Sequence, residues 1–268
     1  MKPAAFDYVR ASHREEVLDL LAEYGQDARI IAGGQSLMAV LNMRLAQPKV
    51  LIDINHVADL NFIERRNGCL AVGAAVRQAQ LLAHPSLADD VPLLAQAMPW
   101  IGHFQTRNRG TVCGSVAHAD PSAELPLCLV TLGGEVILQS KKGQRSVQAA
   151  DFFQGILTTA KRPDELVSEV RFALKRDAIS YRFREVAMRH GDFAMVALAA
   201  AVGDDHVEFG IGGVGDRPQC RRLERGASLK DALNELAWSL DAQDDLHASA
   251  AYRRQLVREL GLRLIEGV

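Results

Sequence analysis

Two short glycine-containing segments have the composition of anion-binding turns. The first reads AGGQS at positions 32–36, and the second reads GTVCGS at positions 110–115. Glycine allows the backbone to turn tightly and to approach a ligand closely, and free N–H groups at the start of a helix attract an anion. Each segment alone also has a purely conformational explanation, because a turn from a strand into a helix needs glycine in any case.

Together the two segments indicate a more specific kind of ligand than either does alone. Two N–H-rich turns on opposite sides of a ligand suit the two phosphoryl groups of a diphosphate, and Ser36, Thr111 and Ser115 offer further hydrogen-bond donors. The carboxylates of Asp120 and Glu124 accept hydrogen bonds and suit the hydroxyl or amino groups of a ribose or an adenine. The sequence therefore predicts a site for a dinucleotide diphosphate.

The best-known glycine motifs for nucleotides do not account for this site. No G-x-G-x-x-G follows a predicted strand and opens a helix, and no G-x-x-x-x-G-K-[ST] phosphate loop occurs. The nearest match, GIGGVG at positions 210–215, comes late, inside a predicted hairpin, and we interpret it as a turn or a bulge. The predicted site is therefore not of the Rossmann type.

Composition and charge describe a folded protein with nearly balanced charge. The 268 residues are 48% hydrophobic and 24% charged, and 31 Lys and Arg oppose 33 Asp and Glu, so no broad basic field attracts nucleic acid or anionic lipid. The four cysteines lack metal-ligand spacing, which predicts no metal, iron–sulfur or disulfide site on this chain. No apolar run has the length of a signal peptide or a membrane span, so we expect a cytoplasmic protein.

The first 55 residues are predicted to form a small α/β unit that carries the first glycine segment. Ser12 and Glu15 form a capping-box pattern, and apolar spacing then predicts a helix up to Gly25. The segment at 32–36 lies between a predicted strand and a predicted helix. The expected elements are a helix over 13–24, a strand over 28–32, a helix over 37–45 and a strand over 49–54.

The rest of the chain predicts an antiparallel sheet with helices and then a second unit of strands followed by helices. Asn67-Gly68 favours a two-residue hairpin turn, and the order of elements beyond residue 175 is typical of an α+β domain. We expect strands over 61–66, 69–74, 134–140, 145–148, 164–172, 179–188, 193–202 and 206–214, helices over 76–83, 91–101, 122–131, 228–240 and 248–265, and an irregular segment over 102–121.

Longer stretches of the sequence resemble one protein family along almost the whole chain. Besides the two glycine segments, the stretches are RNRGTVCGSVAHADPSAELP around the second segment, IDINHV at 52–57, DFFQG at 151–155, PDELVSEVRF at 163–172 and FREVAMRHGDFAMVA at 183–197. In this order they resemble the FAD-binding medium subunit of the molybdenum hydroxylases. That family includes the carbon monoxide, xanthine, nicotine and caffeine dehydrogenases.

The resemblance implies an α+β architecture and a set of cofactor contacts. The FAD-binding domain, of the vanillyl-alcohol-oxidase type, spans 1–175 with subdomains at about 1–55 and 56–175, and a C-terminal domain with an antiparallel sheet and helices spans 176–268. The glycine segments then hold the FAD pyrophosphate, and Glu124 faces the nucleotide half. With Asp120 from the argument above, the predicted contacts are Ala32, Gly33, Gly34, Gln35, Ser36, Leu37, Ile101, Thr111, Cys113, Gly114, Ser115, Asp120, Glu124, Val167 and Arg184.

The resemblance also implies an electron-transfer subunit of an oxidoreductase. A large partner subunit then holds the molybdenum–pterin cofactor, a small partner subunit carries two [2Fe–2S] clusters, and FAD on this chain passes their electrons to an external acceptor in a dimer of heterotrimers. No catalytic residue is expected here, so His103 and His118 are interpreted as loop support. Arg107 and Arg109 either assist the diphosphate, pair with a partner or lie in solvent.

Two alternatives remain open from the sequence. One is a self-sufficient FAD oxidase or reductase of the same fold, and the other is a subunit that has lost FAD and acts as a scaffold. Cys113 bears on the second alternative, because the family usually has glycine there. Either this position has a negative φ and tolerates a small side chain, or the contact with the pyrophosphate is altered.

Overall fold

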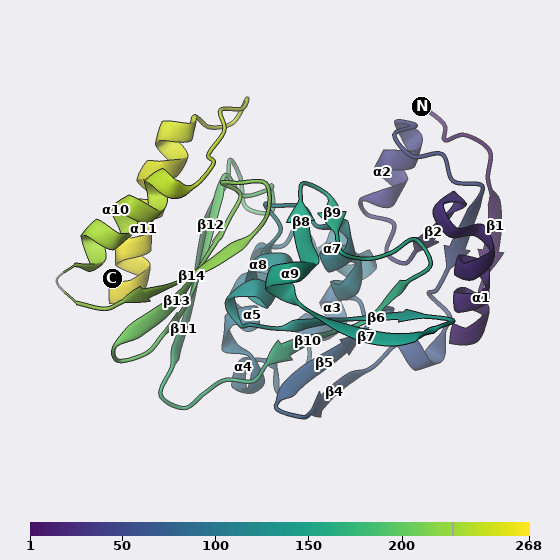
Figure 1. Ribbon diagram of the computed structural model, residues 1–268, viewed down its shortest axis with the longest axis horizontal. Helices are drawn as coiled ribbons and strands as arrows, with labels where there is room; N and C mark the ends of the chain where they lie inside the picture. The colour runs from purple at the N-terminus through teal and green to yellow at the C-terminus, as the bar shows by residue number, and fades with distance from the viewer. Residues whose placement is uncertain (227) are drawn as a thin grey trace.

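The chain folds into three main sheets that follow one another in sequence. The computed structural model describes residues 1–226 and 228–268. Figure 1 shows the N-terminal sheet at one end (purple), the second sheet in the middle (teal), and the third sheet at the other end beside the last two helices (yellow).

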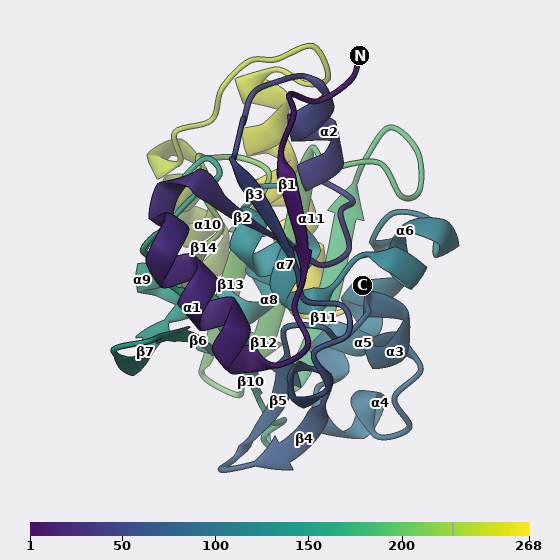
Figure 2. The ribbon, with the colours of Figure 1, turned by 90° about the vertical axis from the view of Figure 1, so that its right-hand side faces the viewer.

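The N-terminal sheet is parallel and carries the first glycine segment at its edge. Its order is β1-β3-β2, with β1 (Asp7–Arg10), β2 (Ala28–Ile31) and the buried central β3 (Val50–Asp53). Helix α1 (Arg14–Tyr24) lies beside it and reaches the second sheet, as Figure 2 shows, and η1 (Gly25–Asp27) and α2 (Leu37–Asn42) complete the unit. Strand β1 is missing from the sequence prediction, because it is short and mostly exposed.

The start of α1 differs by one residue from the predicted capping box. His13 is the N-cap, and its Nδ1 accepts a hydrogen bond of 3.2 Å from the backbone N–H of Glu16. Ser12 instead donates to the Glu16 carboxylate from its backbone N–H and its hydroxyl, at 2.8 and 3.0 Å. The Ser12–Glu15 box is therefore wrong, although the helix itself is confirmed.

The second sheet is antiparallel and begins with the predicted hairpin. Asn67 and Gly68 have φ of 50° and 74°, the left-handed values that a type I′ turn requires. The strand order is β4-β5-β10-β6-β7, and a separate two-stranded ribbon pairs β8 with β9. The strands are β4 (Ile63–Arg66), β5 (Cys69–Gly73), β6 (Glu135–Ser140), β7 (Gly143–Gln148), β8 (Phe153–Gly155), β9 (Thr158–Thr159) and β10 (Leu166–Ala173).

Short helices fill the connections of this middle part. The prediction of an irregular segment over 102–121 is wrong, because it contains α6 and α7. Helix α6 buries none of its residues, so it leaves no apolar period in the sequence. The helices are η2 (Ala58–Leu60), α3 (Gln78–Leu82), α4 (Leu87–Asp90), α5 (Pro92–Ala97), η3 (Met98–Trp100), α6 (Phe104–Arg109), α7 (Val112–His118), α8 (Glu124–Thr131) and α9 (Ala149–Phe152).

The third sheet lies between two layers of helices. It is antiparallel in the order β11-β12-β13-β14, with α5 and α8 on one face and α11 on the other (Figure 1). Strand β13 runs through Gly212, so the predicted turn or bulge over 210–215 begins only at Gly213, whose φ is 76°. The elements are β11 (Ser180–Val186), β12 (Val196–Val202), β13 (His206–Gly212), β14 (Gln219–Glu224), α10 (Leu229–Ser239) and α11 (Ala250–Glu266).

Side-chain size explains how the two helix layers share one sheet. Along β12, Ala197, Ala199 and Ala201 belong to the core cluster that contains α8, whereas Leu198 and Val202 belong to the cluster under α10 and α11. The alanines let α8 approach the strand closely. The first core therefore continues past residue 175, and the division of the chain into domains at that residue remains a prediction.

Candidate functional site

The two glycine segments meet in the structure. The first loop, residues 32–36, lies between β2 and α2, and the second loop, residues 110–115, opens α7. A methyl group on Gly33 would overlap the carbonyl oxygen of Arg109 and lie 2.7 Å from the Cα of Gly110. Only glycine permits this approach of two backbones. The central sequence prediction, that segments about eighty residues apart form one place, agrees with this geometry.

A cleft of about 320 Å³ opens at this junction. The first loop supplies Ala32, Gly33, Gly34 and Gln35 to its wall, all of them predicted contacts. Two cationic side chains, Arg77 and Arg109, and the amide of Asn55 come from elsewhere, and only Arg109 is a candidate from the sequence. The full lining is Ile31, Ala32, Gly33, Gly34, Gln35, Met38, Asn55, Arg77 and Arg109.

Hydrogen bonds fix the walls of the cleft. The Asn55 amide donates to the carbonyl of Ala32 at 3.0 Å, and its Oδ1 accepts from Nη2 of Arg77 at 2.6 Å. The other prong of Arg77 donates to the carbonyl of Arg109. Burial, and then the neighbouring charge of Arg109, lower the pKa of the Arg77 guanidinium. The lining of the cleft contains two cationic side chains and no acidic one, which suits an anion.

The second loop uses Thr111 to start its helix. The Thr111 hydroxyl oxygen accepts a hydrogen bond of 3.1 Å from the backbone N–H of Gly114, and the side chain is buried. A Cβ at Gly114 would lie 2.5 Å from that oxygen, so a side chain at this position would require the Thr111 hydroxyl to shift. Gly114 is exposed and Ser115 half-buried beside it. The loop is thus a capped helix start with one accessible glycine.

Cys113 is in the first turn of α7 and does not have a positive φ. Its side chain is buried, and Sγ donates to the carbonyl of Val72 on β5 at 3.4 Å. Burial, and then the charge of Glu169, raise the pKa of the thiol. Of the two explanations for this departure from the family pattern, the geometry supports the first, since φ is not positive and the small side chain is directed into the protein.

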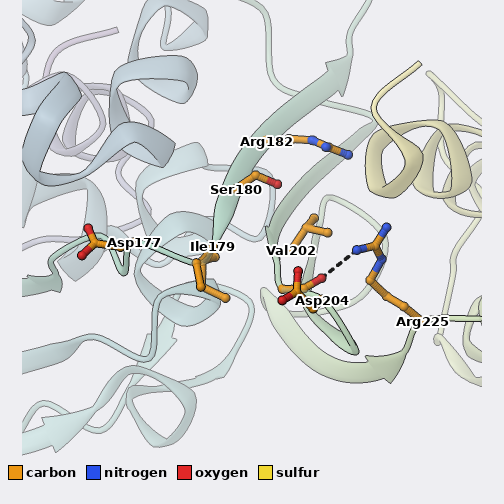
Figure 3. Close-up of a pocket in the computed structure, with 9 residues that line it drawn as sticks. Asp177, Ile179, Ser180, Arg182, Val202, Asp204 and Arg225 are labelled. Atoms are coloured by element: carbon orange, nitrogen blue, oxygen red, sulfur yellow. Dashed lines mark hydrogen bonds between the residues drawn. The ribbon is translucent and has the colours of Figure 1, made fainter.

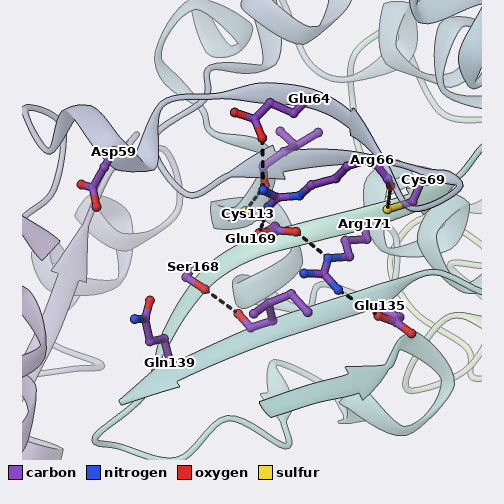
Figure 4. Close-up of polar contacts among 12 residues, drawn as sticks. Asp59, Glu64, Arg66, Cys69, Cys113, Glu135, Gln139, Ser168, Glu169 and Arg171 are labelled. Carbon is purple, nitrogen blue, oxygen red and sulfur yellow. Dashed lines mark hydrogen bonds and ion pairs between the residues drawn. The ribbon is translucent and has the colours of Figure 1, made fainter. Parts of the chain in front are cut away.

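A ladder of charges lies across the second sheet near Cys113. Figure 4 shows Arg66 between Glu64 and Glu169, and Arg171 between Glu169 and Glu135. The Arg171 Nε to Glu169 Oε1 distance is 2.5 Å, and Arg66 pairs with the other oxygen of the same carboxylate. These groups pair with one another across three strands, so the ladder stabilises the sheet rather than offering charge to a ligand.

Other predicted contacts lie outside the cleft. Ile101 and Val167 are buried, the latter on β10. The Asp120 carboxylate accepts from the backbone N–H of Ser122 at 2.8 Å and so forms a turn. Arg184 is exposed on β11. As contacts to a cofactor, these residues remain predictions.

Ser36 and Leu37 lie at the junction of the first loop and α2. Ser36 is the N-cap residue of α2 without a side-chain capping bond, and both residues are half-buried. Of the two arginines left open by the sequence, Arg109 lines the cleft, whereas Arg107 donates to the carbonyls of Ile101 and Gly102 at 2.8 and 3.0 Å. Arg107 therefore supports the loop before α6.

Two buried carboxyl groups lie between α8 and the third sheet. Glu124 begins α8, Glu185 lies on β11, and each is 8% exposed. Neither carboxylate oxygen of Glu185 has a hydrogen-bond partner among the described residues. Burial, and then repulsion by Glu124, raise the pKa of Glu185 to about 8, and burial raises the pKa of Glu124 to about 7. The pair therefore retains a proton at neutral pH.

A second cleft of similar volume, about 320 Å³, lies at one end of the third sheet, where β11 begins and β12 and β14 end (Figure 3). It contains none of the predicted contacts. Its lining includes the carboxylates of Asp177 and Asp204, which repel an anion. The cleft beside the first glycine loop has two arginines and no acidic side chain in its lining, and it is therefore the better anion site.

Comparison with known proteins agrees with this geometry. Residues 4–173 match the family described as the FAD binding domain in molybdopterin dehydrogenase. The chain belongs to this family. It is 37% identical to the nicotine 6-hydroxylase medium subunit of Paenarthrobacter nicotinovorans, over 99% of this chain and 98% of that one. It is 36% identical to the caffeine dehydrogenase subunit beta of a Pseudomonas species, over 99% and 95%.

The fold agrees with a solved structure of the same kind. A chain of quinoline 2-oxidoreductase from Pseudomonas putida 86 superposes with a TM-score of 0.92 at 34% identity, covering 100% of this chain and 98% of that one. The predicted FAD-binding α+β architecture and the prediction of an oxidoreductase subunit are confirmed. Within residues 1–226 and 228–268, no helix combines the length and apolarity needed to cross a membrane.

Replacing Cys113 with glycine tests whether this family departure affects the cofactor. We expect Cys113→Gly to lower the free energy of unfolding by roughly 1–3 kcal/mol, because a buried side chain is lost and glycine disfavours a helix. The affinity for FAD, measured by flavin fluorescence, is expected to change by less than about threefold, since Cys113 does not line the cleft. A tenfold change in FAD affinity would contradict this account.

Proposed function

We propose that this chain is the FAD-carrying electron-transfer subunit of a molybdenum hydroxylase complex. In this role it takes electrons one at a time from [2Fe–2S] clusters on a small partner subunit and passes them to an external acceptor. A large partner subunit carries the molybdenum–pterin cofactor and oxidises the substrate. The observation that carries the proposal is the arginine-lined cleft where two glycine loops from different parts of the family's FAD-binding domain meet.

The residues present fit a dinucleotide diphosphate. Among the described residues, the backbone N–H groups of Gly33, Gly34 and Gln35 donate to no other backbone group. Arg77 and Arg109 supply two positive charges against the two negative charges of a pyrophosphate. The unpartnered, buried oxygens of Glu185 suit a donor such as a ring N–H or a hydroxyl. We therefore propose the two loops as the pyrophosphate cradle, Asp120 and Glu124 for the nucleotide half, and Ile101, Val167 and Arg184 for the flavin half.

The chain's own contribution is binding and orientation. FAD, when bound, exchanges electrons singly with iron–sulfur centres and in pairs with acceptors such as NAD or quinones. The glycine loops hold the diphosphate at a fixed place, and the cations Arg77 and Arg109 neutralise it. The buried apolar side chains of Ile101 and Val167 exclude water on their side.

A group of exposed apolar side chains supports the proposal that a partner subunit binds this chain. Phe104, Met188 and Phe193 are each more than 60% exposed. Phe104 begins α6, and Met188 and Phe193 lie between β11 and β12. These two segments are in contact, because Gly191 approaches the backbone of Gly102 and the tilted rings of Trp100 and His190 have centroids 5.0 Å apart. Exposed apolar patches mark protein–protein contacts. We propose that a partner covers this surface in a dimer of heterotrimers, and the relatives named above are themselves subunits.

Purification of the native protein from its source tests this function. We expect about one FAD per chain, with flavin absorption near about 450 nm, and co-purification of two further subunits with molybdenum and iron. A yellow chain that purifies alone and oxidises a substrate by itself would favour the self-sufficient oxidase. A colourless chain in an otherwise metal-loaded complex would favour the scaffold. Either result would overturn the proposal.

A further inference from the structure

A hydrogen bond between two side chains, those of Asn55 and Arg77, joins the two parts of the protein that carry the glycine loops. Asn55 lies just after β3, on the side of the first loop, and Arg77 lies at the start of α3, on the side of the second loop. We define the hydrogen bond of 2.6 Å from Arg77 Nη2 to Asn55 Oδ1 as the Asn55–Arg77 bridge. The same two side chains hold the carbonyls of Ala32 and Arg109, the residues that precede Gly33 and Gly110.

The Asn55 end of the bridge is anchored on the N-terminal sheet. Asp53, the last residue of β3, is buried, and its Oδ1 accepts from the backbone N–H of Asn55 at 2.8 Å and from the Asn55 amide at 2.6 Å. The Tyr8 hydroxyl on β1 donates to the other oxygen of Asp53. These bonds fix the orientation of the Asn55 amide, with Oδ1 toward Arg77.

The Arg77 end is anchored on the second loop. The backbone of Arg77 pairs with that of Thr111, and its neighbours form bonds of 3.1 Å from Val112 N–H to the Val76 carbonyl and 2.8 Å from Gln78 N–H to the Gly110 carbonyl. The backbone of Arg77 therefore moves with the second loop. Its side chain alone reaches the amide that holds the first loop.

We propose that Asn55 and Arg77 are positioning residues, whose bridge holds the two glycine loops at the separation that a dinucleotide diphosphate requires. This inference rests on the proposed function and deepens it, because it assigns the affinity for FAD to two residues outside both loops. Arg77 also lines the cleft, so it contributes charge as well as position. Asn55 lines the cleft as well but has no charge, so the specific mark of positioning is the dependence of its effect on Arg77, which a double variant measures.

The test is a double-mutant cycle on FAD affinity. The dissociation constant is measured by flavin fluorescence on the deflavinated full chain for the wild type, N55A, R77M and N55A/R77M. We expect each single variant to bind FAD about tenfold or more weakly, and the double variant to bind no more weakly than the worse single variant, because one bridge is lost in each case. R77K retains the charge without the two-pronged donor and is expected to remain weakened at least about threefold.

A matched control exists between the C-terminal helices. Arg258 on α11 donates to Asn234 Oδ1 on α10 at 3.1 Å, the same kind of bond away from the cleft. R258M and N234A are expected to leave FAD affinity unchanged, and thermal melts of all variants report on folding. Wild-type affinity in N55A, additive losses in the double variant, or full affinity in R77K would overturn the proposal. A wild-type chain that binds no FAD would instead overturn the proposed function, and this inference with it.

Discussion

Gly33→Ala is expected to lower the affinity for FAD by at least about 100-fold. The added methyl group would overlap the Arg109 carbonyl and approach the Cα of Gly110 to 2.7 Å. Both are backbone atoms, so no side-chain rotation relieves the overlap, and the two loops must separate. Losing two hydrogen bonds to a charged diphosphate costs about 3–6 kcal/mol, and each 1.4 kcal/mol is about tenfold in affinity. Fluorescence titration of the deflavinated chain with FAD measures the loss.

The matched control for this variant is Gly155→Ala. Gly155, on β8, would place its methyl group 3.5 Å from a carboxylate oxygen of Asp216, an ordinary contact. We expect this control to bind FAD like the wild type. If Gly33→Ala retained FAD within about threefold, the close approach of the loops would not determine cofactor binding. A thermal melt separates that outcome from unfolding, because a folded variant keeps a cooperative transition.

The sequence predicts those parts of the site whose conformation is determined by a few neighbouring residues. A glycine pair between a strand and a helix and an Asn-Gly turn are encoded within a few residues, so the first loop and the β4–β5 hairpin could be placed from the sequence. Asn55 and Arg77 could not, because the role of each depends on partners more than twenty residues away. An asparagine after a strand and an arginine before a helix have no distinctive local pattern.

Glu185 is different, because a signal for it was present in the sequence. Along β11, Tyr181 and Phe183 are buried while Arg184 is exposed, as alternation in a strand requires. Glu185 therefore falls on the buried face, in a position where a carboxylate is unusual. The family resemblance implies a cofactor contact for the preceding residue, Arg184, and none for Glu185. The period-2 pattern of the strand instead places Glu185, the next residue, on the buried face, where burial raises the pKa of its carboxyl group.

That environment makes stability depend on pH in a defined direction. The pKa of Glu185 is raised to about 8 and that of Glu124 to about 7, above their ordinary value of 4.5 in the unfolded chain. Between pH 4.5 and 8 the folded chain therefore binds more protons than the unfolded chain, and the free energy of unfolding falls as pH rises. Below pH 4.5 both states are protonated, and above about pH 8 the loss is complete.

Glu185→Gln is expected to remove much of this loss. Glutamine matches the shape of the protonated side chain, has no charge to desolvate and is not repelled by the charge of Glu124. We expect the variant to unfold at the same temperature as the wild type at pH 4.5, and to gain about 2 kcal/mol, or about 4–8 °C, at pH 8. Melts of the FAD-free chain across this range measure the difference without a contribution from cofactor binding.

The exposed Glu224 at the end of β14 provides the control, since its replacement by glutamine leaves the buried pair intact. Glu224→Gln is expected to follow the wild type at every pH. If the wild type and Glu185→Gln lost stability in parallel between pH 4.5 and 8, other groups would be the source of the pH dependence. A gain that is as large at pH 4.5 as at pH 8 would also contradict the account, because it would show that packing, and not charge, distinguishes glutamine from glutamate at this position.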